Sequence, residues 1–168
     1  MSRSILCAAL LAAIALSPVA CAADKPTVVL VHGAFADTSS WNGVIGRLRK
    51  DGYTVVAAAN PLRSVKSDAT YVADIVADIK TPVVLVGHSY GGSVISEAAE
   101  GHDNVKALVY VSAFSPEAGE TAAGISGKFP GSTLGPTLAP PVPLSSGGND
   151  LYIQQAKFPA QFAADVPA

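Results

Sequence analysis

The sequence predicts an α/β fold in which a parallel sheet of about four strands is covered by helices on both faces. Four short apolar runs lie between residues 27 and 111, as expected for strands that are buried on both faces. Segments with the spacing of amphipathic helices separate these runs, and such strand–helix–strand crossovers favour parallel pairing. The third run ends in a glycine-rich turn that opens the next helical segment. These observations together predict the fold class.

The expected elements alternate regularly along the chain. The predicted strands are Thr27–Val31, Tyr53–Ala58, Pro82–Val86 and Val105–Val111. The first helical segment starts at Trp41 and ends at Gly52, and the third covers Ser93–Glu100. The second is capped by Ser67 or Asp68, whose side chains accept hydrogen bonds from free amides at a helix start. The residues expected to face the sheet from the first two helices are Trp41, Val44, Ile45, Leu48, Tyr71, Val72, Ile75, Val76 and Ile79.

Residues 1–23 have the pattern of a signal peptide. Arg3 provides a positive start, the apolar run Ile5–Leu16 follows, and small residues precede the expected cleavage site. The run is too short to span a bilayer, so we expect an exported, periplasmic or secreted protein without stable membrane insertion after cleavage. Both cysteines, Cys7 and Cys21, lie in this segment, so no disulfide is expected in the mature protein. A membrane anchor and a lipoprotein attached through Cys21 are the alternatives.

The composition changes near residue 115. Residues 24–115 carry the strand–helix alternation and are expected to form the core. Eight of the 12 prolines lie from Pro116 onward, together with many glycines, so residues 116–148 can form neither a long helix nor a central strand. A short helical pattern resumes within 151–162. We therefore interpret residues 116–168 as an irregular, incomplete lid region.

Several classes of function are excluded by composition. The formal net charge is −2 and no long basic run occurs, which argues against nucleic-acid binding. The sequence contains no histidine pair or carboxylate cluster that predicts a metal site, and no phosphate-binding glycine-rich loop. We expect neither a metal nor another cofactor.

The motif with the clearest chemistry is Gly87-His88-Ser89-Tyr90-Gly91, which matches the nucleophile-elbow pattern G-x-S-x-G. It follows a predicted buried strand and opens a predicted helix, as that pattern requires. The bend is so tight that side chains two residues before and after Ser89 would collide, so glycine is needed at positions 87 and 91. Ser89 is therefore the candidate nucleophile.

A second turn supports this interpretation. His32-Gly33-Ala34 follows the first strand, at the same edge of the predicted sheet. In hydrolases with this elbow, one amide that binds the oxyanion belongs to the residue after the nucleophile, here Tyr90. The other comes from the loop after the neighbouring strand, and Ala34 is the candidate, with Gly33 as a turn residue.

At this point the chain resembles a known family. The segments VLVHGAFADTSSW, NPLRS and VVLVGHSYGG are similar to small α/β-hydrolases that include bacterial esterases, plant methylesterases and hydroxynitrile lyases. The resemblance is strong over 26–115 and weak over 116–168. It implies a partial α/β-hydrolase fold and a triad of serine, Asp or Glu, and histidine, whose last two members we expect to be missing from this chain.

The remaining titratable residues are expected to have other roles. His102 is predicted to lie in a surface loop, and His88 is predicted to pack beneath the turn at Ser89. His32 is predicted to pack in the loop after the first strand, and the alternative is that it acts as the catalytic base. Glu117 and Glu120 follow the fourth strand, where some related hydrolases carry the acid, but solvated loop carboxylates are expected. Asp37 and Asp150 are also expected to lie in loops.

The predicted function is acyl transfer by a serine hydrolase. Ser89 would attack a small carboxylic ester and form an acyl-enzyme, but the chain lacks the triad acid and histidine, so the sequence leaves open whether it is active or an inactive fragment. A hydroxynitrile-lyase-like enzyme on the same fold is one alternative. A non-catalytic binding protein that uses the hydrolase-like pocket is the other.

Overall fold

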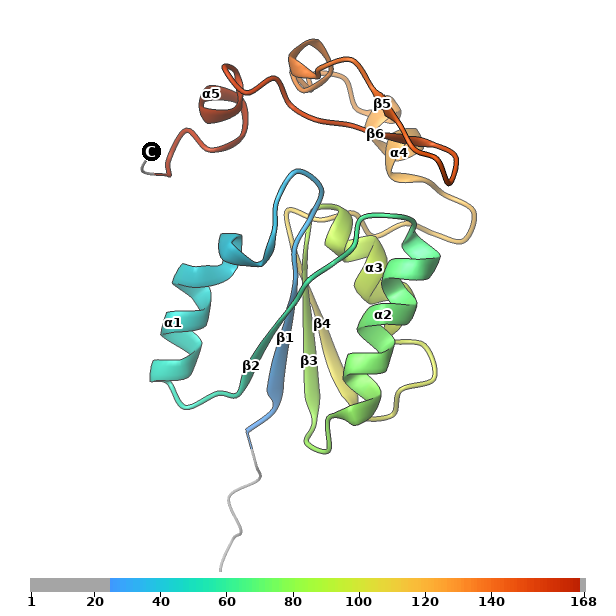
Figure 1. The fold of residues 1–168 in the computed structure, drawn as a ribbon. Helices are drawn as coiled ribbons and strands as arrows, with labels where there is room; N and C mark the ends of the chain where they lie inside the picture. The colour runs from blue at the N-terminus through green and yellow to red at the C-terminus, as the bar shows by residue number, and fades with distance from the viewer. Residues whose placement is uncertain (1–24, 167–168) are drawn as a thin grey trace, which may run out of the picture.

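The predicted strands form one parallel sheet in the order β2-β1-β3-β4. The computed structural model describes residues 25–166, so the signal peptide expected over 1–23 lies outside the described residues. Figure 1 shows the four strands side by side at the centre of the molecule: β1 (Thr27–Val31), β2 (Val55–Ala58), β3 (Val83–His88) and β4 (Val105–Val111). Relative to the prediction, β2 begins two residues later and β3 extends two residues further, to the residue before Ser89.

The order of strands reverses at β1, because β2 pairs with one side of β1 and β3 with the other. Val31 at the end of β1 pairs with Gly87 near the end of β3, and His88 pairs with Val111. The carboxyl ends of these strands therefore meet at one edge of the sheet. In open α/β sheets, ligands bind at this edge where the strand order reverses, because the loops after the two central strands diverge there.

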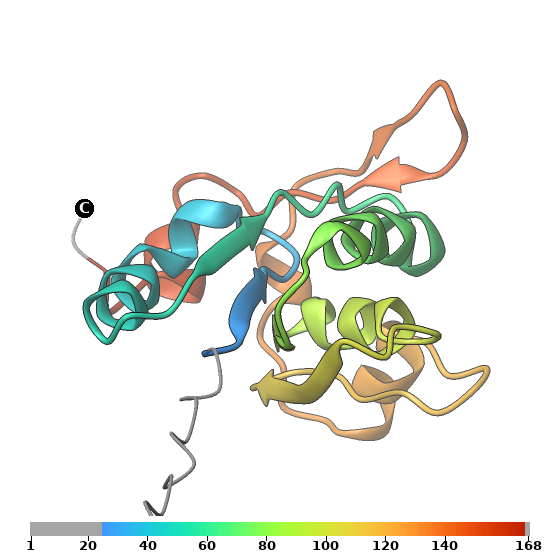
Figure 2. The same ribbon diagram turned by 90° about the horizontal axis from the view of Figure 1, so that it is seen from below.

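Helices cover both faces of the sheet, as predicted, and Figure 2 shows the sheet between α1 on one side and the pair α2 and α3 on the other. The 3₁₀ turn η1 (Thr38–Trp41) and α1 (Asn42–Lys50) bury Trp41 against Val28 and Leu30. The helices α2 (Val65–Asp78) and α3 (Tyr90–Ala98) cover the opposite face. The buried residues of that larger cluster are Val29, Val31, Ala58, Ala69, Val72, Val76, Val83, Leu85, Val94, Ile95 and Ala98.

Two of the predicted sheet-facing residues are instead partly exposed. Val44 is 39% and Tyr71 40% exposed, so each lies on the flank of its helix. The face of α1 toward the sheet is occupied by Ile45 and Leu48, which pack beside Trp41. Helical spacing identified the buried face of each helix correctly but included one residue too many in it. An apolar residue at the edge of the face has nearly the same spacing as the buried ones.

The starts of two helices differ from the prediction. The cap of α2 is Ser64, whose hydroxyl accepts a hydrogen bond from the amide of Ser67, so the helix begins before the predicted caps Ser67 and Asp68. Asp68 is instead fully buried within the first turn of the helix. The helix α3 begins at Tyr90 rather than Ser93, because the chain passes from strand to helix through a single residue.

The cap segment, residues 116–166, crosses the carboxyl edge of the sheet in Figure 1. As the proline and glycine content predicts, its longest regular element has only seven residues. The elements are α4 (Ala122–Lys128), η2 (Gly135–Thr137), the hairpin strands β5 (Val142–Pro143) and β6 (Asn149–Asp150), and α5 (Phe158–Phe162). None of the described helices is long and apolar enough to cross a membrane.

Candidate functional site

Strained backbone is concentrated at the carboxyl edge of the sheet. Four described residues other than glycine have a positive φ, and one follows each strand: Phe35 (62°) after β1, Leu62 (58°) after β2, Ser89 (52°) after β3 and Ser112 (42°) after β4. Such conformations cost about 1–3 kcal/mol each and persist only where the surrounding structure enforces them. This edge is therefore the candidate functional site.

Ser89 is the single residue between β3 and α3, with φ 52° and ψ −121°. Its amide donates a hydrogen bond to the carbonyl of Val111 at 3.3 Å, and its carbonyl accepts from the amides of Gly92 and Phe114, both at 3.0 Å. The backbone of Ser89 is thus held on both sides, and α3 starts directly after it. The free amides at the start of a helix favour a developing negative charge beside the Ser89 hydroxyl.

The glycines around Ser89 have no room for a side chain. A Cβ at Gly87 would lie 2.5 Å from the carbonyl oxygen of Gly91, and a Cβ at Gly91 would overlap the carbonyl oxygen of Val31. A Cβ at Gly33 would lie 2.8 Å from the Cβ of Ser89. The last contact brings the turn after β1 against the turn after β3, so Gly33 lies next to Ser89.

The histidines have the places expected from sequence. His32 is buried and its Nδ1 lies 2.9 Å from the carbonyl oxygen of Gly33, within the turn after β1. The His88 ring packs edge-to-face on Trp41, with centroids 6.4 Å apart, and His102 lies in the loop between α3 and β4. Within residues 25–166, the Ser89 hydroxyl makes no hydrogen bond with a histidine.

The acidic loop residues are engaged elsewhere. The Asp37 carboxylate accepts the Ser39 amide and caps η1, and these hydrogen bonds lower the pKa of Asp37. Glu120 accepts from Lys128 and from the amide of Glu117, and the hydrogen bond from Lys128 is the main cause of its lowered pKa. Among the described residues, neither Glu117 nor Glu120 has a histidine to orient.

Burial lowers the pKa of His88 below its ordinary value of 6.5. His88 is therefore protonated near pH 6.5 in the unfolded chain but only at lower pH in the folded protein. We expect the free energy of unfolding to be largest above this pH and to decrease as the pH falls below it. Urea unfolding between pH 5 and 8 tests this, because His88→Gln should flatten the curve. A variant curve parallel to that of the wild type would contradict the prediction.

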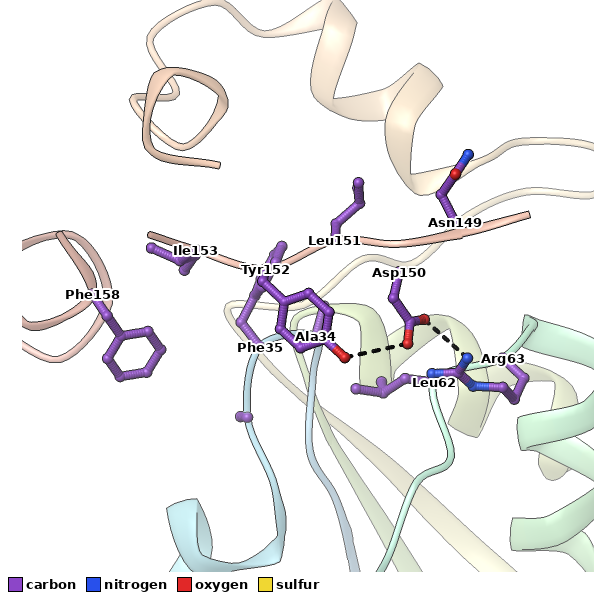
Figure 3. Close-up of a pocket in the computed structure, with 11 residues that line it drawn as sticks. Ala34, Phe35, Leu62, Arg63, Asn149, Asp150, Leu151, Tyr152, Ile153 and Phe158 are labelled. Carbon is purple, nitrogen blue, oxygen red and sulfur yellow. Dashed lines mark hydrogen bonds and ion pairs between the residues drawn. The ribbon is translucent and has the colours of Figure 1, made fainter. Parts of the chain in front are cut away.

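A pocket of about 460 Å³ lies between the edge of the sheet and the cap segment, as Figure 3 shows. The core contributes the turn after β1 and the loop after β2, and the cap contributes β6 and the residues that follow. The lining residues are Ala34, Phe35, Ala36, Leu62, Arg63, Asn149, Asp150, Leu151, Tyr152, Ile153 and Phe158. Ser89 does not line the pocket, whereas Ala34 does, and Ala34 follows Gly33, which lies against Ser89.

Charged groups at this pocket are paired. The Arg63 guanidinium donates to the Asp150 carboxylate at 2.9 Å, and Figure 3 shows this ion pair joining the loop after β2 to the cap. The ion pair is partly exposed and contributes roughly 0.2–1 kcal/mol. Apolar contacts add to it, because the Phe35 ring packs edge-to-face on Phe162 of α5, with centroids 6.2 Å apart. The cap is thus attached to two of the loops at the candidate site.

Sequence reasoning missed two residues of this region. Asp150 was assigned to a loop, but its partner Arg63 lies 87 positions away in sequence, and no local pattern predicts such a pair. Asp68 was assigned to a helix cap, but its carboxylate accepts a hydrogen bond from the Tyr90 hydroxyl at 2.8 Å. A signal for Asp68 existed, since it precedes Val72 by one helical turn and so lies on the apolar face of α2.

Comparisons with known proteins agree with this geometry. The model of a family described as the alpha/beta hydrolase family matches residues 28–168. The alpha/beta hydrolase nvfD of Aspergillus novofumigatus is 34% identical over 119 residues, which cover 60% of this chain and 48% of that protein. The carbendazim hydrolyzing esterase of a Nocardioides species is 32% identical over 106 residues, covering 55% of this chain and 44% of that protein.

Solved structures show the same similarity. The crystal structure of a PytH variant, 26% identical, superposes with a TM-score of 0.68 and covers 85% of this chain and 63% of that chain. PytH is described as a pyrethroid hydrolase. The chain spans about half the length of the curated relatives it matches.

Proposed function

Because the chain belongs to the alpha/beta hydrolase family, we propose that it is a serine hydrolase that cleaves a small carboxylic ester through an acyl-enzyme on Ser89. The observation that carries this proposal is the conformation of Ser89. Its backbone is held at φ 52° at the head of α3, in contact with the turn after β1. Strain of this kind is maintained by the surrounding structure at catalytic turns.

The reaction follows from this arrangement. The Ser89 oxygen attacks the ester carbonyl carbon while its proton passes to a water molecule, because no described histidine reaches the hydroxyl, and the carbonyl oxygen becomes a tetrahedral oxyanion. The amides of Ala34 and Tyr90 donate hydrogen bonds to that oxyanion. The C–O bond to the alcohol then breaks, the alcohol leaves with a proton, and water hydrolyses the acyl-enzyme to the acid and free Ser89.

The pocket supports an uncharged ester as substrate. Most of its lining is apolar or aromatic, and its one cation, Arg63, is already neutralised by Asp150. A charged ligand would lose hydration there without gaining a free partner, whereas an apolar group is favoured by burial. The named substrates of two relatives, carbendazim and pyrethroids, are consistent with a hydrolase of neutral organic molecules.

Labelling with a fluorophosphonate probe tests the role of Ser89. We expect phosphorus to bond to the Ser89 oxygen with release of fluoride, detectable by mass spectrometry of the peptide that contains it. Ser89→Ala should abolish the labelling. Ser93→Ala is the matched control, since Ser93 lies in α3, the helix directly after Ser89, and its buried hydroxyl has no hydrogen-bond partner among the described residues. If the probe leaves Ser89 unmodified, the proposed acyl-enzyme is wrong.

One observation favours a second candidate function. No described histidine reaches the Ser89 hydroxyl, which is the arrangement expected of a non-catalytic protein that binds neutral ligands in the same pocket. In a hydrolase, the amides alone still leave about 10³–10⁴-fold acceleration over water when the other triad members are removed. Hydrolysis of p-nitrophenyl acetate separates the two, because an acyl-enzyme releases a burst of one equivalent of p-nitrophenol that Ser89→Ala removes, whereas a binding protein shows no burst.

A further inference from the structure

Asp68 is a buried carboxylate that makes no ion pair with any cation among residues 25–166. Its exposed fraction is 0%, and its two oxygens accept the amide of Arg63 at 3.0 and 3.2 Å. They also accept the hydroxyl of Tyr90 at 2.8 Å and that of Ser67 at 3.3 Å. Burial of an ionised carboxylate is unfavourable unless hydrogen bonds compensate for its lost hydration. The donors of Asp68 are therefore held firmly in place.

The donor from α3 belongs to the residue after Ser89. Burial, and next the hydrogen bond to Asp68, raise the pKa of Tyr90 far above its ordinary value, so the hydroxyl remains a proton donor at any physiological pH. The Tyr90 side chain is thereby anchored to α2. Its own amide, one of the two proposed oxyanion donors, is part of the peptide group that joins it to Ser89. Rotation of that peptide would displace the Tyr90 ring from Asp68.

The second donor to Asp68 is the amide of Arg63, a residue that lines the pocket. Arg63 follows Leu62, which has a strained φ of 58°. Leu62 lies in the chain between Arg63 and the buried Asn60, and both of these residues are fixed by hydrogen bonds. The Asn60 side-chain amide donates to the carbonyl of His32 at 3.0 Å, at the start of the turn that carries Ala34. The loop after β2 is therefore bonded directly to the turn after β1, and it is connected to Tyr90 only through Asp68.

We propose that Asp68 is a positioning residue that holds the amide of Tyr90 toward the oxyanion and the Leu62–Arg63 wall against the pocket in one arrangement. This proposal rests on the proposed function of Ser89. Asp68 is one helix away from the reacting atoms and acts through the Tyr90 hydroxyl and the Arg63 amide. It also links the Ser89 turn to the cap, because the Arg63 side chain binds Asp150.

The test compares Tyr90→Phe with Tyr110→Phe. Each variant removes one tyrosine hydroxyl that lies 2.8 Å from its hydrogen-bond partner. The partner of Tyr90 is Asp68, and the partner of Tyr110 is Ser96 of α3. We measure the saturating rate of Ser89 labelling by the fluorophosphonate and the probe concentration at half saturation. Tyr90→Phe should lower the saturating rate about tenfold with little change in half saturation, less than the 10²–10³-fold cost of removing an oxyanion donor. Tyr110→Phe should change neither.

Asp68→Asn extends the test, because asparagine replaces one of the two acceptor oxygens with an amide donor, so the Tyr90 hydroxyl and the Arg63 amide must compete for the oxygen that remains. Its loss of rate should not add to that of Tyr90→Phe in the double variant, as expected for residues that act through one hydrogen bond. Full additivity would overturn the proposal. Should Asp68→Asn fail to fold, the two tyrosine variants still decide the outcome.

The possible failures are distinguishable. If wild-type Ser89 is not labelled, the proposed function fails and the positioning role fails with it. If wild-type Ser89 is labelled and Tyr90→Phe is labelled at the same saturating rate, only the positioning role fails. The same holds if Tyr90→Phe lowers the melting temperature without lowering the saturating rate, because the hydrogen bond then has a purely structural role.

Discussion

Replacement of Gly91 by alanine is expected to destabilise the protein by about 3 kcal/mol or more. The new Cβ would overlap the carbonyl oxygen of Val31 and lie 3.0 Å from that of His32. Both oxygens belong to the backbone at the end of the central strand β1, so no side chain can move aside to relieve the contact. Relief requires α3 to move away from β1, which separates the turn after β3 from the turn after β1.

The measurement is urea unfolding followed by circular dichroism, with Gly46→Ala as the control. Gly46 lies in the interior of α1, and a Cβ there meets no atom within 4 Å. Alanine at this position should stabilise the helix by about 0.5–1 kcal/mol, because glycine loses more conformational entropy on folding. A Gly91→Ala protein as stable as the wild type would show that α3 does not approach β1 as closely as described.

Replacement of Ser89 by glycine is expected to stabilise the protein while removing its proposed activity. The positive φ of 52° is strained for serine and unstrained for glycine. Relief of about 1–3 kcal/mol of strain, less about 0.5–1 kcal/mol for the entropy of glycine in the unfolded chain, leaves a net gain of about 0–2.5 kcal/mol. The same variant should lose all fluorophosphonate labelling, because the hydroxyl is absent.

Two further serines serve as controls for this prediction. Ser112 also has a positive φ, 42°, so Ser112→Gly should stabilise the protein without abolishing the labelling. Ser96 lies within α3, where glycine should destabilise by about 0.5–1 kcal/mol. Thermal unfolding of the three variants gives the comparison. An unfolding temperature of Ser89→Gly below that of the wild type would argue against strain at position 89.

Local patterns predicted the core of the fold because each buried element carries its own signal. The run Thr27–Val31 is buried at every position, and its boundaries agree with the prediction. Val72 and Val76, chosen from helical spacing alone, are both fully buried. For the cap segment the sequence predicts only irregular structure and a short helix within 151–162, where α5 lies, since its other short elements are held by distant contacts such as that between Leu138 and Ile153. Proline and glycine exclude regular structure locally but do not specify an alternative.

The candidate site divides in the same way. The strand–turn–helix context of Ser89, the glycines that its bend requires and the family were all accessible from sequence, because they depend on neighbouring residues and on tight backbone geometry. The roles of Ser89, Ala34 and Tyr90 remain predictions. The residues that support them were not accessible, because the acceptor of the Tyr90 hydroxyl is 22 positions away, on another helix.

The sequence by itself determined the alternation of strands and helices, the sharp turn at Ser89 and membership of the hydrolase family, because burial periodicity and glycine requirements are local properties. Only the tertiary structure decided which polar residues meet. It placed Asp68 beneath Tyr90, and it joined Arg63 of the core to Asp150 of the cap. The physical reason is that parallel crossovers bring loops far apart in sequence to one edge of the sheet, where buried charges must find partners.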